Sequence, residues 1–177
     1  MELIQLISRA DRSAFEVLYR AYFQRLSRFL SSAFHNSRLI EEVINETMFV
    51  VWQKADTYNH ASKVSTWIFA IAYRQALKAI NQSDEPVDNE VGQELDNEEN
   101  EPEQQLSRLQ LGQLIQGALK SLPFEQRIVV SLTYFHDMGY QEIAEMINCP
   151  VNTVKTRMFH ARLKLKNMLS LHMGVTE

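Results

Sequence analysis

Apolar residues recur at intervals of three and four positions through most of this chain, which is the period of amphipathic helices. In residues 1–82 the pattern predicts three helices, and Asp11 suits the N-cap of the first. The second is expected at Ser37–Lys54 and the third at Lys63–Ile80, after a polar loop at Asp56–Ser62. The first stripe consists of Phe15, Leu18, Tyr19, Tyr22, Phe23, Leu26, Phe29 and Leu30. No stretch alternates with the period of a strand, so the fold is predicted to be all-α.

The second half of the chain ends in a pair of short helices. Helices are expected near Leu106–Lys120 and Pro123–Phe135, followed by one at about Tyr140–Ile147 and one that begins near Asn152. The turn between the last two is Asn148-Cys149-Pro150-Val151. Apolar residues that can close a small core between these two helices are Ile143, Ile147, Val154 and Met158. This arrangement is typical of a helix-turn-helix, whose second helix enters the major groove of DNA.

The predicted recognition helix carries basic residues and no acidic residue from Asn152 to Lys166. One face, at three- and four-residue spacing, consists of Asn152, Lys155, Thr156, Phe159, His160 and Leu163. On this face the candidates for contacts with base edges are Lys155, Thr156, Phe159 and His160. The candidates for phosphate contacts, which position the helix, are Arg157, Arg162, Lys164 and Lys166.

Charge divides the chain into three segments. Residues 1–82 contain 10 Lys/Arg and 7 Asp/Glu, and residues 106–177 contain 8 and 5. Residues 83–105 contain no Lys/Arg and 10 Asp/Glu, with few apolar residues. Such a segment cannot bury enough surface to offset its ordering entropy, so a flexible acidic linker is predicted at 83–105. We call residues 1–82 the N-terminal lobe and 106–177 the C-terminal lobe, and we expect each to be a small helical domain.

Several classes of protein are not supported by the sequence. There is no signal peptide and no apolar run long enough to span a membrane, and the single cysteine, Cys149, fits a reducing cytoplasm. The five histidines show no metal-ligand spacing, and there is no glycine-rich phosphate loop or nucleophile motif. We therefore expect no enzyme activity, no cofactor and no small-molecule substrate. A helix-turn-helix regulator with an N-terminal effector or dimerisation domain remains open, as does a helical protein whose basic helix binds an acidic partner.

Three blocks of sequence carry a more specific resemblance. They are EVINETMFVVW (Glu42–Trp52), STWIFAIAYRQAL (Ser65–Leu77) and LKSLPFEQRIVVSLTYFHDMGYQEIAEMINCPVNTVKTRMFHARLKL (Leu119–Leu165). In this order they resemble the polymerase-docking helix, the promoter-opening helix and the promoter-binding domain of bacterial sigma factors of the extracytoplasmic-function class. The resemblance covers nearly the whole chain outside the linker.

The resemblance implies a cytoplasmic protein that binds core RNA polymerase and directs transcription from specific promoters. The N-terminal lobe would dock on the clamp helices of the largest polymerase subunit and would recognise and melt the minus-10 element. The C-terminal lobe would read the minus-35 element. The docking residues would be Glu41, Glu42, Asn45 and Glu46. The minus-10 residues would be Tyr58, Asn59, His60, Ser62, Lys63, Arg74 and Lys78. An anti-sigma factor, often membrane-bound in this family, would be a further partner.

The chain departs from the family pattern at three positions. Asn152 stands where the family usually has glycine, His160 where it often has arginine, and Tyr73 where it usually has a basic residue. Asn152 could cap the recognition helix. His160 removes a fixed charge, so the base preferences of relatives are not expected to carry over unchanged.

Overall fold

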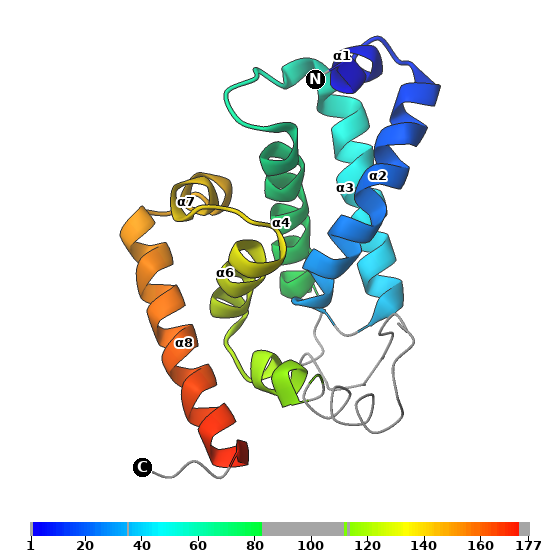
Figure 1. The fold of residues 1–177 in the computed structure, drawn as a ribbon. Helices are drawn as coiled ribbons and strands as arrows, with labels where there is room; N and C mark the ends of the chain where they lie inside the picture. The colour runs from blue at the N-terminus through cyan, green and yellow to red at the C-terminus, as the bar shows by residue number, and fades with distance from the viewer. Residues whose placement is uncertain (1, 35, 83–111, 113, 174–177) are drawn as a thin grey trace, which may run out of the picture.

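The computed structural model describes residues 2–34, 36–82, 112 and 114–173, and these residues form helices and turns without a strand (Figure 1). The N-terminal lobe contains α1 (Glu2–Ile7), α2 (Arg12–Ser31), α3 (Ser37–Lys54), the short 3-10 helix η1 (Ala55–Thr57) and α4 (Val64–Gln82). The C-terminal lobe contains a helical segment at 114–120, α6 (Phe124–Phe135), α7 (Tyr140–Ile147) and α8 (Val151–Met173). The all-α prediction is therefore confirmed.

Capping residues fix where the long helices of the N-terminal lobe begin. Asp11 is the N-cap of α2, and its side chain accepts a hydrogen bond from the backbone N–H of Ala14 at 3.0 Å. Asn36 plays the same part for α3 by accepting from the N–H groups of Arg38 and Leu39. These bonds satisfy donors that the first turn of a helix leaves unpaired. The predicted bounds of α3 are confirmed at both ends.

Helices α2, α3 and α4 pack side by side around an apolar core (Figure 1). The rings of Phe29 and Phe69 lie at its centre, edge to face, with centroids 5.2 Å apart. Other side chains with no exposed surface are Leu26, Leu30, Ile44, Val51, Ile68, Ala72 and Ala76. Helix α1 was not predicted, and its Ile4 and Ile7, each 2% exposed, cover this core beside α2 and η1.

The helix-turn-helix is formed by α7 and α8, as predicted. Asn148 ends α7 in the left-handed conformation (φ 54°), which asparagine tolerates better than most residues. Ile143, Val154 and Met158 are buried between the two helices. One detail of the prediction is wrong: α8 begins at Val151, directly after Pro150, so Asn152 lies inside the first turn and does not cap the helix.

The two lobes are packed against each other, although separate cores were expected. Helix α7 lies on α4, and α6 contacts α2, so that the buried residues of both lobes form one continuous cluster. The His136 ring lies 4.7 Å from the Phe69 ring and 6.0 Å from the Phe29 ring, between centroids. Tyr73 of α4, 7% exposed, stacks on Phe124 of α6 with an interplanar angle of 11°. Aromatic contacts therefore join the lobes at two points.

The linker predicted at 83–105 and the start of the helix predicted at Leu106–Lys120 lie outside the described residues. The described part of that helix, 114–120, is helical as expected. The division into domains at 1–82, 83–105 and 106–177 stays a prediction. Among the helices described, none combines the length and the apolar composition needed to cross a bilayer.

The environment of His136 generates a prediction about stability and pH. Burial lowers the pKa of His136 from 6.5 to about 4, and the nearby charges of Arg25 and Arg28 act in the same direction, against Asp137. As the pH falls through this window, the unfolded chain binds a proton that the folded protein does not. The free energy of unfolding is therefore expected to be greatest above pH 6.5 and to fall between pH 6.5 and 4.

Replacing His136 with Phe should flatten this pH dependence, because the ring contacts are kept and the titrating group is removed. The Nε2 atom of His136 is buried with no hydrogen-bond partner among the described residues, so the replacement breaks no observed bond. Urea unfolding at pH 7.5, 6.0 and 5.0 measures the effect, and His160→Phe, at an exposed position, is the control. Equal pH slopes for His136→Phe and the unchanged protein would contradict the assignment.

Candidate nucleic-acid interface

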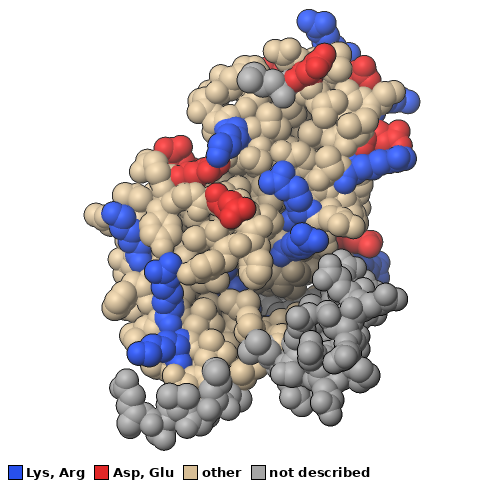
Figure 2. Space-filling view, viewed as in Figure 1, with Lys and Arg blue, Asp and Glu red and all other residues tan. Residues whose placement is uncertain are grey.

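Helix α8 presents the predicted base-reading side chains to solvent. Lys155, Thr156, Phe159 and His160 are all exposed, and Phe159 retains 64% of its surface. The Phe159 ring contacts the neighbouring His160 ring, 5.5 Å away between centroids, and otherwise stands among basic side chains, where it suits contact with a thymine methyl group. Asn152 is also exposed, and its backbone oxygen accepts a hydrogen bond from the Thr156 hydroxyl at 2.9 Å. Figure 2 shows basic side chains following α8 down the left edge of the molecule.

Three of the predicted phosphate contacts also brace α8 against the rest of its lobe. Arg157 is largely buried and forms an ion pair with Glu125 at the start of α6. Arg162 donates to the Tyr134 hydroxyl at 2.9 Å, and Lys164 donates to the backbone oxygen of Ser121 at 2.7 Å. Arg162 and Lys164 are nevertheless exposed, so they can reach DNA with a modest change of rotamer. Arg157 has the strongest structural role of the three.

Tyr58 shapes the loop that carries most of the residues expected to contact the minus-10 element. This residue is 8% exposed, and its hydroxyl donates to the backbone oxygen of Ser62 at 2.5 Å. Its ring lies 4.7 Å from the His60 ring and 5.2 Å from the Trp67 ring, between centroids. Tyr58 therefore offers no free ring face to DNA in this structure, although the resemblance placed it among the minus-10 residues. It holds the loop in shape instead.

Of the other residues expected to contact the minus-10 element, all except Ser62 are exposed. His60 is exposed and has a positive φ of 61°, a strained conformation of the kind found at functional sites. Asn59 is exposed, and its Oδ1 accepts from the N–H of Ala61 at 3.1 Å. Arg74 and Lys78 are exposed one turn apart on α4. Lys63 is exposed at the start of α4, with its Nζ 3.5 Å from the Glu142 carboxylate of the C-terminal lobe.

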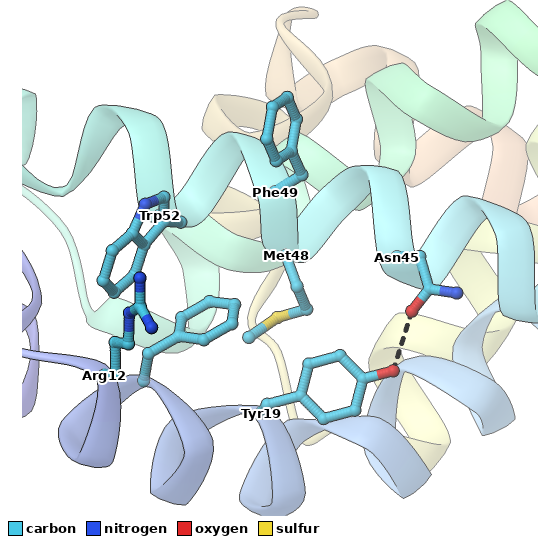
Figure 3. Close-up of a pocket in the computed structure, with 7 residues that line it drawn as sticks. Arg12, Tyr19, Asn45, Met48, Phe49 and Trp52 are labelled. Atoms are coloured by element: carbon cyan, nitrogen blue, oxygen red, sulfur yellow. Dashed lines mark hydrogen bonds between the residues drawn. The ribbon is translucent and has the colours of Figure 1, made fainter.

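Helix α3 displays the predicted docking residues on one exposed face. Glu41, Glu42, Asn45 and Glu46 are all exposed. Asn45 also accepts a hydrogen bond from the Tyr19 hydroxyl at 2.8 Å across to α2 (Figure 3). Burial raises the pKa of Tyr19, and the negative charge of Glu41 raises it further.

An open groove adjoins this acidic face and was not predicted. Its volume is about 540 Å³, and it lies between α2 and α3, lined by Arg12, Phe15, Tyr19, Asn45, Met48, Phe49 and Trp52 (Figure 3). Phe49 is 54% exposed. A signal was present in the sequence, because Phe49 is four residues after Asn45 and so shares the acidic face of the helix. The face therefore combines negative charge with an exposed aromatic ring.

The described residues hold no group of three or more His, Cys, Asp or Glu side chains that could bind a metal ion. Cys149 is half-buried in the turn of the helix-turn-helix.

Comparison with known proteins identifies both lobes. A family profile described as "Sigma-70 region 2" matches residues 18–85, and one described as "Sigma-70, region 4" matches residues 112–165. The first contains the exposed faces of α3 and α4, and the second contains the helix-turn-helix.

Complete relatives align with the chain along nearly all of its length. The "ECF RNA polymerase sigma-E factor" of Escherichia coli K12 is 27% identical over 175 residues, which cover 93% of this chain and 91% of that protein. Its counterpart from Haemophilus influenzae is 22% identical, covering 94% and 93%. The fold resembles the sigma factor RpoE from Bartonella quintana, solved with the anti-sigma factor NepR (TM-score 0.72, 20% identity, 88% and 96% covered). It also resembles CnrH, solved with the cytosolic domain of CnrY (TM-score 0.68, 18% identity, 96% of each chain).

The chain belongs to the sigma-70 family of RNA polymerase sigma factors, in its extracytoplasmic-function class. It binds core RNA polymerase and directs promoter-specific initiation of transcription; the family acts as an initiation factor and not as an enzyme. The alternative of a helix-turn-helix regulator is not favoured, because the N-terminal lobe that would hold its effector or dimerisation domain matches sigma-70 region 2.

The exposed face of α8 generates a prediction about upstream recognition. Replacing Phe159 with Ala should change the base preference at the minus-35 element and cost about 1–3 kcal/mol at the affected position. Stability should be nearly unchanged, because this ring is 64% exposed. Selection of promoters from a library randomised at this element, with the reconstituted holoenzyme, measures the preference. Val17→Ala, at an apolar residue of α2 that is 55% exposed, is the matched control.

Lys155 and Lys164 test the division between base and phosphate contacts. Lys155→Ala should alter the selected sequences, whereas Lys164→Ala should weaken binding to all sequences and reduce its salt dependence. The same selection profile for both variants would show that the division is wrong.

Proposed function

We propose that this sigma factor docks on the clamp helices of the largest polymerase subunit through Glu41, Glu42, Asn45 and Glu46. The observation that carries the proposal is the face of α3 itself, where the three carboxylates are exposed and, among the described residues, enter no ion pair. Such charges speed association and fix register when they meet a basic surface. Phe49 and the groove beside it would add apolar contact at the centre of the interface, where burial contributes most.

The promoter contacts are assigned to the two other surfaces. The loop at Asn59–Lys63, with Arg74 and Lys78 of α4, would recognise and melt the minus-10 element, and α8 would read the minus-35 element. The geometry supports this assignment because the loop is rigidly held by Tyr58 yet exposes Asn59 and His60. Capture of an unpaired base needs a preformed support and polar partners of this kind.

We further propose a cytoplasmic location, where core polymerase and promoter DNA are found, and regulation by an anti-sigma factor. The proteins of similar fold include RpoE, solved with the anti-sigma factor NepR. In this chain the groove between α2 and α3 offers such a regulator an apolar site next to the docking face. A regulator seated there would compete with polymerase for Asn45 and Phe49.

Charge reversal on α3 tests the docking surface. Glu42→Lys and Glu46→Lys should each weaken binding to core polymerase several-fold at physiological salt, since an attractive contact becomes a repulsive one. Folding should be unaffected because both side chains are exposed. Glu145→Lys, an equal change of charge at an exposed position of α7, is the control in the same titration. Unchanged affinity of both α3 variants would remove this helix from the interface.

Replacement of Asn59 and His60 together by Ala tests strand opening, with Tyr58 kept so that the loop retains its shape. Core binding and upstream binding should be normal, whereas unpaired thymines in the minus-10 region should be reduced in permanganate footprints. A pre-melted promoter should restore part of the loss, because the cost of unpairing is then already met. A normal footprint on duplex promoter would show that the loop is only a connector.

A further inference from the structure

One ionic contact between the lobes involves a residue of the promoter surface. The Glu142 side chain of α7 lies at the start of α4, where its Oε2 is 3.5 Å from Nζ of Lys63. Its Oε1 accepts a hydrogen bond from the hydroxyl of Thr66. The carboxylate is thus held by two donors, one of which, Lys63, the proposed function assigns to DNA.

The two donors differ in how far water reaches them. Thr66 is 3% exposed, and the Glu142 side chain retains only 21% of its surface, so water is largely excluded from the hydroxyl–carboxylate bond. The Lys63 side chain, in contrast, is 75% exposed and can turn toward either a carboxylate or another anion. A lysine and a neighbouring hydroxyl are also the donors that proteins use for the phosphates of nucleic acid.

We propose that Glu142 occupies, while the lobes are packed together, the position of a promoter DNA phosphate between Lys63 and Thr66. Helix α7 and the DNA backbone then compete for the same two donors, and Thr66 becomes a further contact to DNA once α7 has moved away. The inference rests on the proposed function, because it concerns the regulation of the same minus-10 surface. The free sigma factor would bind DNA weakly until the lobes separate.

Apolar packing between the lobes explains how the Glu142 carboxylate is kept beside Lys63 and Thr66. The contacts of His136 with Phe29 and Phe69, and of Tyr73 with Phe124, hold the C-terminal lobe against α2 and α4. An exposed ion pair alone would contribute little to closure. Because this packing already holds the C-terminal lobe in place, the Glu142 carboxylate needs only to bind Lys63 and Thr66 more strongly than a DNA phosphate does.

Binding of a fluorescein-labelled single strand of twenty thymidines to the full chain, without polymerase, tests the competition. Glu142→Gln should bind this strand about two- to tenfold more tightly than the unchanged protein, the effect of removing one charge-assisted competitor. The matched control is Glu145→Gln, which removes the same charge from an exposed position of the same helix, where the side chain bonds only to Gln141 among the described contacts. This control should stay within twofold of the unchanged protein.

A second pair of variants checks that the freed donors do the binding. Adding Lys63→Gln or Thr66→Val to Glu142→Gln should abolish the gain, and Thr66→Val keeps the volume of the buried side chain. Equal gains from Glu142→Gln and Glu145→Gln would overturn the proposal, because net charge would then explain both. A gain that survives both added substitutions would overturn it as well.

Core polymerase titration of the same proteins separates this inference from the proposed function. Glu142→Gln should bind core polymerase like the unchanged protein, since the α3 face lies elsewhere. Normal core binding with unchanged affinity for the thymidine strand would overturn the competition and leave the docking proposal standing. Loss of core binding in the α3 variants has no bearing on the thymidine assay.

Discussion

Helix α4 has to bury apolar side chains on two sides and still keep a polar strip, and the rest of the molecule is arranged around this requirement. Ile68, Phe69 and Ala72 fill the core shared with α2 and α3. Tyr73 and Thr66 face the C-terminal lobe. Arg74 and Lys78 remain on the strip that is left. Because a helix offers one continuous cylinder to its neighbours, the packing of α7 fixes how much of the surface of α4 is left for any other partner.

The charge of each surface has more effect on which partner binds there than the net charge of the whole chain. The formal net charge is −4, yet the 10 acidic residues of 83–105 outweigh two lobes that each have more basic than acidic residues. Charges in water are screened over about 8 Å at physiological salt, so a partner senses only the surface it approaches. An acidic α3 and a basic α8 can therefore serve polymerase and DNA on one small molecule without cancelling each other.

The sequence predicted those features that depend on neighbours within a few residues. Helical period placed α3, Asp11 placed the start of α2, and the spacing of Ile143, Val154 and Met158 placed the helix-turn-helix. Features that join distant segments were missed. Tyr58 lies in a polar loop and was placed among the minus-10 residues, but its contacts with Trp67 and Ser62 bury it. Arg157 was predicted to contact phosphate, and the sequence did not show its ion pair with Glu125, which lies 32 residues away along the chain. The six residues of α1 are too few for a period to be read.

The contact between Glu142 and the start of α4 also joins distant segments, so the sequence did not predict it. Its position suggests the order in which polymerase binds and the lobes separate. The docking residues proposed on α3 are exposed while the lobes are packed together, so in this proposal core polymerase binds the closed molecule first. Separation of the lobes then exposes more of the partly buried Phe124 ring and of the buried Tyr73 and Phe69 rings, which is unfavourable in water. Polymerase can offset that cost only if it binds the open arrangement more tightly than the closed one. Docking through α3 alone favours neither arrangement, so the differential contacts must come from the C-terminal lobe or from promoter DNA.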